Sequence, residues 1–328
     1  MSLPDIFHGA LRLPVIAAPM FLVSGPELVI ACCRAGVAGS LPALNARPAS
    51  QLDDWLRQVE LARDDAESAQ KTFAPYGINL ILHASNPRLR EDVEIVVRHH
   101  VPFVITSLGH PGSIVAAVHE YGGLVFADVI HAHHARKAIE AGVDGIIAVA
   151  AGAGGHAGVQ SPFSLVREIR EFWDGCLILG GAISDGYGVR AAEVLGADLA
   201  YLGTRFIATA EAHAQSEYKQ MLIDARAQDV VYTDAISGAN ANFLLPSLTA
   251  AGYTRESLQP GVGKAVLKDL AEEAKAWRDV WSAGHGVANI HDAPDVATLV
   301  ERLHHEYLTA CATPALRGPG NADDSRQQ

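Results

Sequence analysis

Short apolar runs recur along the first two thirds of the chain, separated by helical patterns of about a dozen residues. Within each run the apolar residues are consecutive instead of alternating with polar ones, as expected for parallel strands buried on both faces. The runs are Pro14–Ala17, Val37–Leu41, Gly77–Leu82, Phe103–Thr106, Leu124–Ala127, Gly145–Val149, Leu177–Leu179 and Leu199–Leu202. Eight such strand–helix units predict a (β/α)8 TIM barrel. A doubly wound sheet is the alternative, but it would not usually need eight parallel strands.

Helix boundary signals agree with this division. Ser24–Glu27 has the spacing of a capping box with a proline in the first turn, and the helix is expected to end near Gly36. Another helix is expected to begin at Ser184–Gly186. The phrase Gly-x-Asp precedes two of the strands, at Gly142–Asp144 and Gly196–Asp198, and marks the period of the repeat.

The strand signal fades after about residue 210. Residues 211–228 and 262–280 have helical patterns, whereas 230–248 is irregular and rich in Asn, Ser and Gly; residues 292–312 are amphipathic. We therefore predict an α/β chain with a barrel over 1–210, a smaller, mainly helical cap or substrate domain over 211–290, a helix packing on the barrel over 291–314, and a flexible tail over 315–328.

Composition narrows the class of protein. Of 328 residues 49% are hydrophobic, which is ample for a large core, and the net charge of −12 argues against nucleic acid as the main partner. No apolar run approaches the roughly 18 residues of a membrane span, and the first residues lack the pattern of a signal peptide. The four cysteines form no CxxC pair, which disfavours a disulfide framework or a zinc site. These features predict a cytoplasmic enzyme acting on a small molecule.

A glycine-rich loop, Gly152–Gly158, follows the apolar run Gly145–Ala150 and carries one histidine, His156. Dense glycine lets a backbone approach a ligand closely and adopt positive φ at little cost. An imidazole is the side chain best suited to moving protons near neutral pH. The loop is typical of an active site; the alternative is a tight turn with an incidental histidine.

Two further strand ends are marked by glycine. Gly180 and Gly181 follow the seventh strand, and Gly203 and Thr204 follow the eighth. In a barrel these ends lie side by side, where glycine amides and a hydroxyl near helix N-termini can cradle a phosphate. The alternative is that both are tight packing turns.

Other strand ends carry residues suited to a flat ring. Ala18, Pro19 and Met20 would let the backbone and a polarizable side chain touch a ring system. Asn79 lies inside an apolar strand, and Asp128 ends another. A buried polar group must be satisfied, so each either pairs with a barrel neighbour or contacts the polar edge of a cofactor.

Two other chemistries receive little support. His131, His133 and His134 do not have the i, i+4 spacing of a helical zinc site, which favours a solvated helix start. Ser247 lacks a nucleophile elbow, which disfavours a hydrolase triad.

In this order, the Ala-Pro-Met, Ala-Gly-Ala-Gly-Gly-His-Ala-Gly, Gly-Gly-Ala and Leu-Gly-Thr-Arg-Phe motifs resemble the nitronate monooxygenase family, also called 2-nitropropane dioxygenases. The likeness spans roughly residues 10 to 310 and includes Leu195–Phe206, Ser237–Leu244 and Trp281–Gly286. It implies an FMN enzyme built on a TIM barrel with a smaller helical domain. One departure is that Val149–Ala153 replaces the polar members of the family loop, which bears on substrate and reaction details more than on flavin binding.

The resemblance also implies roles for individual residues. His156 aligns with the catalytic histidine, and Phe21, Trp281 and His285 are candidate walls of the substrate pocket. The implied cofactor-binding residues are Ala18, Pro19, Met20, Asn79, Asp128, Gly154, Gly155, Gly180, Gly181, Leu202, Gly203 and Thr204.

The implied reaction is the oxidation of alkyl nitronates, and of nitroalkanes after proton abstraction, by O2 to carbonyl compounds and nitrite. An NAD(P)H-dependent FMN reductase acting on quinones or enoyl thioesters is the first alternative, and a non-catalytic flavin- or phosphate-binding protein is the second. The physiological substrate, the electron acceptor and the oligomeric state, a homodimer included, are left open by the sequence.

Overall fold

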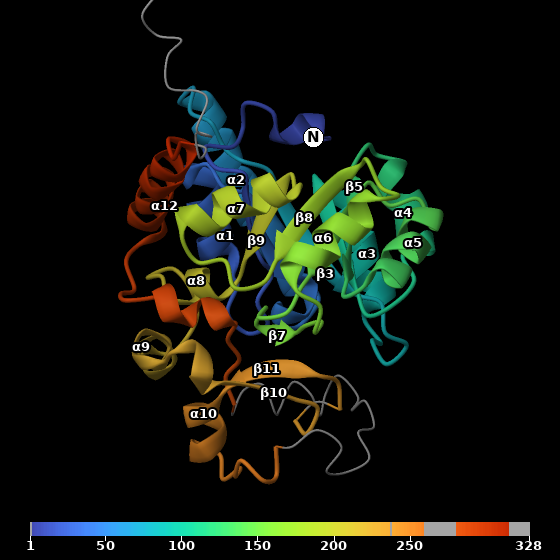
Figure 1. Ribbon diagram of the computed structural model, residues 1–328. Coiled ribbons are helices and arrows are strands. Elements are labelled where there is room, and N and C mark those ends of the chain that lie inside the picture. Colours follow the sequence, from blue (N-terminus) through green and yellow to red (C-terminus); the bar gives the residue numbers. More distant parts are fainter. Residues whose placement is uncertain (1, 237, 259–279, 315–328) are drawn as a thin grey trace, which may run out of the picture.

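A closed ring of eight parallel strands forms the centre of the molecule (Figure 1). The computed structural model describes residues 2–236, 238–258 and 280–314. The ring order is β1-β9-β8-β6-β5-β4-β3-β2, and a bridge between Ile16 and Ala38 joins its two ends. The strands are β1 Val15–Ala17, β2 Gly39–Pro42, β3 Tyr76–Ile81, β4 Phe103–Ser107, β5 Leu124–Val129, β6 Gly145–Val149, β8 Cys176–Gly180 and β9 Leu199–Leu202. Each predicted run overlaps one strand, so the predicted TIM barrel is confirmed.

Helices surround this barrel. They are α1 Pro26–Ala35, α2 Ser50–Ser68, α3 Leu89–Arg98, α4 Gly112–His119, α5 Ala132–Glu140, α6 Pro162–Arg170, α7 Gly186–Leu195, α8 Thr204–Ile207 and α12 Val296–Cys311, with the short 3-10 segments η1 Asp5–Phe7 and η2 Ala43–Asn45. The predicted C-terminal amphipathic helix is α12, which packs on α7 and α1. A Cβ atom at Gly186 would lie 2.2 Å from the Tyr307 nitrogen, so glycine permits this close contact.

The predicted helix ends are right, but one cap differs. Asp185 caps α7 by accepting a hydrogen bond from the Gly188 nitrogen at 2.7 Å, and α1 ends at Gly36 in a left-handed conformation. The expected capping box at Ser24 is absent. The Ser24 hydroxyl instead accepts from the Met20 nitrogen at 2.9 Å, because the preceding turn brings that amide closer.

Aromatic rings close one end of the barrel. Phe7, from η1, lies against Phe103 and Phe126, with ring centroids 5.8 and 6.2 Å away. All three side chains are fully buried at the amino end of the strands. The interior at this end is therefore solid, and a ligand can enter only from the carboxyl end.

The repeated Gly-x-Asp phrase has a common structural role. Asp144 accepts hydrogen bonds from the Val125 nitrogen at 2.7 Å and from the His119 ring at 2.8 Å. Asp198 accepts from the Leu177 nitrogen at 2.8 Å and from Arg170 at 2.6 Å. Each aspartate thus satisfies the amide of the second residue of the neighbouring strand, which would otherwise lack a partner at the edge of the ladder.

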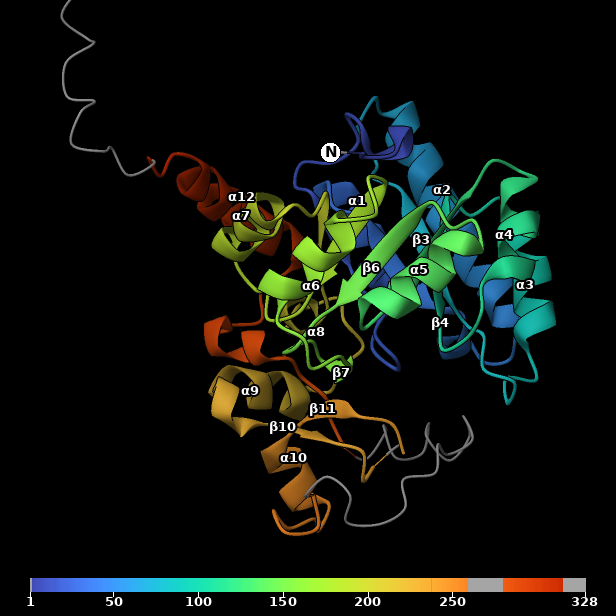
Figure 2. The same ribbon diagram turned by 45° about the vertical axis from the view of Figure 1, so that its right-hand side comes forward.

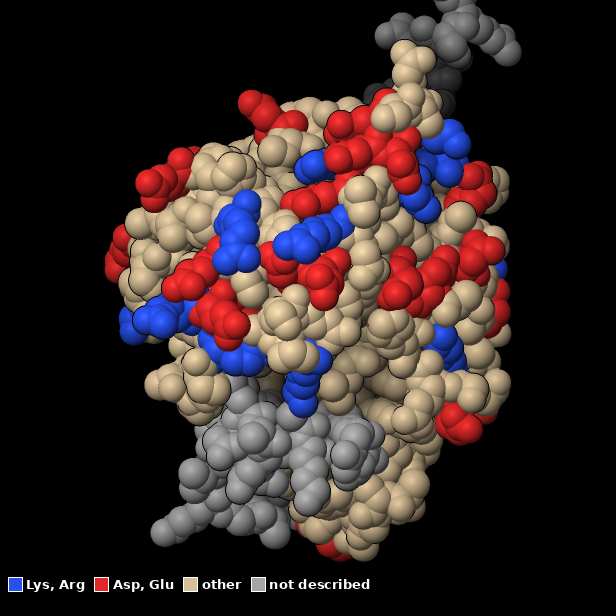
Figure 3. Space-filling model, turned by 180° about the vertical axis from the view of Figure 1, so that it is seen from behind, with Lys and Arg blue, Asp and Glu red and all other residues tan. Residues whose placement is uncertain are grey.

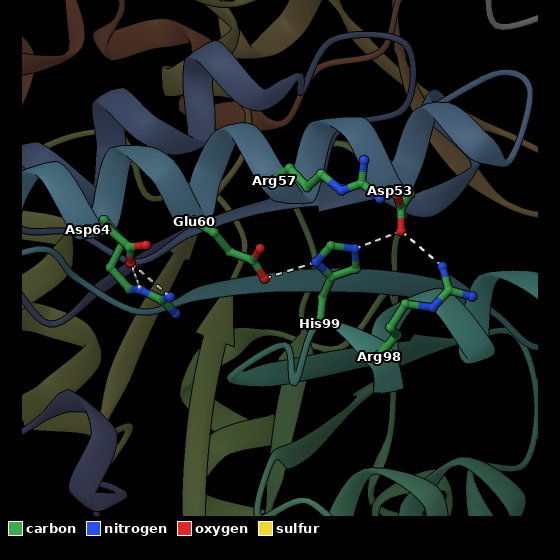
Figure 4. A network of polar contacts seen from close by, with 7 residues as sticks. Asp53, Arg57, Glu60, Asp64, Arg98 and His99 are labelled. Atoms are coloured by element: carbon green, nitrogen blue, oxygen red, sulfur yellow. Dashed lines mark hydrogen bonds and ion pairs between the residues drawn. The ribbon is translucent and has the colours of Figure 1, made fainter.

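The outer helices are joined by polar contacts at the surface. His99 lies between Asp53 and Glu60 of α2, at 2.9 Å from each carboxylate, and Arg98 also contacts Asp53 (Figure 4). The hydrogen bond from His99 lowers the pKa of Asp53. Acidic and basic side chains are interspersed over the rear face of the molecule (Figure 3). Within the described ranges, no helix has the length and apolar character needed to cross a membrane.

A smaller unit covers the carboxyl end of the barrel (Figures 1 and 2). It contains α9 Ser216–Asp224, η3 Ala227–Asp229, β10 Val230–Thr233, β11 Ala241–Leu244, α10 Leu245–Ala250 and η4 His285–Asn289. The strands β10 and β11 form a three-stranded antiparallel sheet with β7 Gly155–His156, which comes from the glycine-rich loop.

Part of our expectation for this unit is wrong. Within 230–248, expected to be irregular, the β-branched and aromatic run Val230–Thr233 pairs antiparallel with Ala241–Leu244, and a short helix, α10, follows at Leu245. The helix expected over 211–228 is confined to Ser216–Asp224. The predicted helix over 262–280, except its last residue, and the predicted tail over 315–328 lie outside the described residues.

Replacing Asp198 by alanine is expected to destabilise the barrel. It would leave Arg170 without its buried carboxylate, and removing one partner of a buried ion pair costs about 3–5 kcal/mol. Urea unfolding measures the loss. Asp54→Ala, at an exposed position of α2, is the control and should change stability by less than about 0.5 kcal/mol. Equal effects of the two substitutions would contradict this account.

Candidate functional site

A cavity of about 1240 Å³ lies between the carboxyl ends of the barrel strands and the small unit. Its volume exceeds the roughly 300–1,000 Å³ of an ordinary ligand pocket, so it can hold a cofactor and a substrate together. The cavity brings together most residues that the sequence singled out: Ala18, Pro19, Met20, Phe21, Asn79, Asp128, Gly154, Gly155, His156, Gly180, Gly181, Gly203, Thr204 and Trp281. Leu202 is instead buried in β9, and the exposed His285 lies against Gly152, outside the cavity wall.

The small unit holds the loop that carries His156. In the sheet, His156 is paired with Ala241 and Gly155 with Asn242. The buried Asn242 side chain donates a hydrogen bond to the Ala153 carbonyl at 2.7 Å. Tyr232 donates to the carbonyl of Ala157 at 3.0 Å. Contacts on both sides of His156 therefore fix the loop at the cavity.

A second segment of the small unit presses on the other side of this loop. The His285 nitrogen donates to the Gly152 carbonyl at 2.9 Å, and the Gly284 nitrogen donates to Thr204 Oγ1 at 2.9 Å. A Cβ atom at Gly154 would lie 2.9 Å from the Gly284 nitrogen. Glycine is required here because two backbones are in contact, whereas the sequence pattern had suggested an approach to a ligand.

The two glycine-marked strand ends lie next to each other, since β8 pairs with β9. Gly181 has φ +134°, and a Cβ atom there would lie 3.0 Å from the Ala151 carbonyl oxygen. At Gly203 a Cβ atom would make only ordinary contacts of 3.6–3.8 Å with Ala18 and Met20. The protein alone therefore requires glycine at Gly181 but leaves room for a small side chain at Gly203.

The floor of the cavity is polar. Asn79 donates through Nδ2 to the Ile105 carbonyl at 3.2 Å and to Ser107 Oγ at 2.8 Å. Ser107 donates in turn to Asp128 Oδ2 at 2.5 Å. Burial raises the pKa of Asp128 to about 6, and the hydrogen bond from Ser107 opposes this shift. Of the two readings left open for Asn79 and Asp128, pairing with a barrel neighbour is present for both.

Strained backbone borders the same cavity. Leu22, Leu108 and Ala182 have φ of 61°, 57° and 56°, in loops that follow β1, β4 and β8. Residues without glycine's freedom adopt this conformation only where the surroundings impose it, and such strain clusters at functional sites. Asn45 contributes by donating to the carbonyls of Met20 and Ser24, at 2.9 and 2.8 Å.

The charge of the wall differs from that of the whole protein. Among the described residues that line the cavity, Arg47, Arg88 and Lys137 are cationic and Asp128 is the one carboxylic acid; Arg88 is paired with the buried Asp92 at 2.7 Å, so Arg47 and Lys137 supply most of the positive charge. The chain as a whole has a net charge of −12. A positive wall in an acidic protein favours anionic ligands.

Several residues of the site were missed by sequence reasoning. Ser107 and Tyr201 follow the pattern of polar residues near a strand end, which was a usable signal. Tyr218 stacks on Trp281 with centroids 4.9 Å apart, and Asn242 supports the loop; neither role has a local signal, because both depend on the placement of the small unit. Ser184 Oγ lines the cavity and is buried without a hydrogen-bond partner among the described residues.

Two residues considered for a zinc site and for a hydrolase triad, His131 and Ser247, have structural roles. His131 caps α5, its ring accepting a hydrogen bond from the His134 nitrogen at 3.2 Å. In the described part of the chain, no group of three or more potential ligands is placed to hold a metal ion. Ser247 is buried and accepts from the Trp281 nitrogen at 2.8 Å.

Comparison with known proteins agrees with the geometry. The family model described as nitronate monooxygenase matches residues 56–306. A nitronate monooxygenase of Paraburkholderia phytofirmans is 28% identical, covering 89% of this chain and 92% of the relative. A Mycobacterium tuberculosis protein, named (3aS,4S,5R,7aS)-5-hydroxy-7a-methyl-1-oxo-octahydro-1H-indene-4-carboxyl-CoA dehydrogenase, is 29% identical, covering 96% and 84%.

Two solved structures share the fold. FabK from Thermotoga maritima has a TM-score of 0.77 at 24% identity, covering 94% of this chain and 96% of that one. A nitroalkane oxidase from Streptomyces ansochromogenes has a TM-score of 0.77 at 24% identity, covering 94% and 99%. From the family match over most of its length and the residues gathered at its cavity, the chain belongs to the nitronate monooxygenase family of flavin-dependent oxidoreductases.

Proposed function

We propose that this chain is an FMN-dependent nitronate monooxygenase, which oxidises alkyl nitronates with O2 to carbonyl compounds and nitrite. The observation that carries the proposal is a cavity with a net positive wall, containing His156, in a protein of net charge −12. A nitronate is a small anion, so the cations of the wall favour its entry over that of the neutral carbonyl product.

Several features of the cavity support FMN as the flavin. FMN carries a single phosphate, and Gly181, Gly203 and Thr204 lie together where a barrel commonly holds such a group. The Thr204 oxygen accepts from Gly284, so its own hydrogen is available to donate to an anion. The buried, unpartnered hydroxyl of Ser184 lies in the same wall. Ala18–Met20, which lies against Gly203, offers an apolar surface for the ring.

The residues of this chain have distinct tasks in such a reaction. A bound flavin supplies the capacity to take electrons from the substrate and pass them to O2. His156 abstracts the α-proton of a neutral nitroalkane, or donates a hydrogen bond to a nitronate that enters already ionised. The paired rings of Tyr218 and Trp281 cover the cavity from the side of the small unit and limit its access to water.

A second function is favoured by the mouth of the cavity. Leu22, Leu108 and Ile130 line it and are 37–38% exposed, so each leaves apolar surface that a ligand could cover. An apolar mouth next to Lys137 and Arg47 also fits a long chain with an anionic end. The relative named as a CoA dehydrogenase makes an NAD(P)H-dependent oxidoreductase acting on thioesters or quinones the alternative.

Anaerobic stopped-flow absorbance distinguishes the two. Propyl-2-nitronate should reduce the bound flavin, nitrite should appear when air is admitted, and NAD(P)H should have no rapid effect. Fast reduction by NAD(P)H together with an inert nitronate would instead establish the reductase. A protein that cannot be loaded with FMN would overturn both functions.

Replacing His156 by alanine should affect nitroalkanes more than nitronates. Loss of a general base lowers kcat/KM by about 10²–10⁴-fold for a substrate that must first lose a proton, whereas a nitronate needs no such step. Steady-state oxygen consumption with both substrates measures the difference, and flavin content should be unchanged. His133→Ala, on the exposed side of α5, is the control. Equal losses on both substrates would argue against the role of base.

Substitution at Gly203 tests the phosphate site. Because the protein leaves space for a Cβ atom there, Gly203→Ala should bind FMN within a few-fold of the wild type. Gly203→Asp places a carboxylate beside the phosphate, and like charges about 4 Å apart repel by about 4 kcal/mol at an effective dielectric constant of 20, a loss on the order of a thousand-fold in affinity. Fluorescence titration of the apoprotein measures both. Full flavin retention by the aspartate variant would place the phosphate elsewhere.

A further inference from the structure

The polar floor of the cavity is a hydrogen-bond chain with a defined direction. The Ile105 carbonyl can only accept, so the nitrogen of the Asn79 side chain must face it. The same nitrogen donates to Ser107 Oγ, whose hydrogen is given to Asp128 Oδ2. An ionised carboxylate can only accept, so Asp128 orients the Ser107 hydroxyl, and through Ser107 it adds a second constraint to the one that Ile105 places on Asn79.

This direction determines what Asn79 offers to a ligand. Both of its amide hydrogens are used within the barrel, by Ile105 and by Ser107. The side-chain oxygen of Asn79 makes no hydrogen bond to the described residues. It is not enclosed by protein atoms either, so it faces the cavity that Asn79 lines. Asn79 therefore presents its side-chain oxygen to a ligand as a hydrogen-bond acceptor. The oxidised isoalloxazine ring has a single N–H group, which could donate to that oxygen.

A carboxyl group at position 128 is costly to the protein. Asp128 Oδ1 is buried and has no partner in the described chain, and neither has the hydroxyl of Tyr201, which projects from β9 toward the same carboxyl. Burying a charge without full pairing opposes folding, and it raises the pKa of Asp128 to about 6. An amide or an apolar residue would suit the packing better, which points to a role in binding.

We propose that Asp128 is a positioning residue for the flavin: through Ser107 it fixes the direction of the chain so that Asn79 keeps its oxygen toward the N–H group of the ring. The inference rests on the proposed binding of FMN in this cavity. Asp128 itself need not touch the cofactor, because its effect passes through the two intervening hydrogen bonds.

Discrimination between two flavins tests this proposal. FMN and an FMN analogue methylated on the ring N–H are titrated into apoprotein at about pH 7.5 and followed by fluorescence. The wild type should prefer FMN by about tenfold or more, since the methyl group removes the hydrogen bond to Asn79. Ser107→Ala and Asp128→Leu should lower that preference to within about threefold, because each removes an acceptor of the chain, whereas an asparagine at 128 could still accept from Ser107.

The control is Asp144→Asn, which alters a carboxylate at the opposite end of β5. It should keep the wild-type preference. If Asp128→Leu and Ser107→Ala also keep it, the positioning role is wrong although FMN binds as proposed. If the wild type binds neither flavin, the proposed function fails, and this inference with it.

Thermal unfolding of the apoprotein separates a positioning role from a structural one. Because burial raises the pKa of Asp128 to about 6, its charge destabilises the folded protein fully above about pH 6, and the penalty falls gradually as the pH drops toward the ordinary aspartate value of about 3.9. Asp128→Asn should therefore raise the Tm most at about pH 7.5 and by roughly half as much at about pH 5. A lower Tm at both pH values would show that Asp128 serves folding and would overturn the proposal.

Discussion

The site depends on one constraint, the fixing of the glycine-rich loop between the barrel and the small unit. The loop leaves β6 and contributes β7, which pairs with β11. Without that pairing, a loop so rich in glycine would have many accessible conformations, and the imidazole of His156 would have no defined position. The small unit is therefore more than a cover, because it supplies the sheet in which the candidate catalytic residue is held.

The same constraint explains where cavity volume is available. Phenylalanine rings fill the amino end of the barrel, so space for a ligand exists only at the carboxyl end. There the glycines after β6 and β8 keep side chains out of the volume and let backbones meet. The packed amino end of the barrel and the close backbone contacts at its carboxyl end hold the walls of the cavity in place. Walls that are already ordered reduce the entropy that is lost when a ligand binds.

The sequence predicted the barrel well because each buried parallel strand is a continuous apolar run, a local signal that needs no knowledge of its neighbours. It also predicted the strand-end residues, since the topology brings all such ends to one rim. It failed where an assignment depends on distant pairing. The strand Val230–Thr233 is paired with β11, and Tyr218 stacks on Trp281, which lies far from it in the sequence. Ser24 does not cap its helix, because its hydroxyl accepts a hydrogen bond from the nearby Met20 amide instead.

The charges of the cavity include one, on Asp128, that lowers the stability of the fold. Cations in the wall favour anions, yet the floor retains the carboxyl of Asp128, which burial disfavours. Its charge would also weaken the binding of anionic substrates if it faced them directly. The Ser107 hydroxyl, however, donates to one oxygen of this carboxyl, and the neutral amide of Asn79 is the next group along the chain at the cavity. The carboxylate of Asp128 can thus orient the Asn79 oxygen through two hydrogen bonds, while the cations of the wall still attract an anionic substrate.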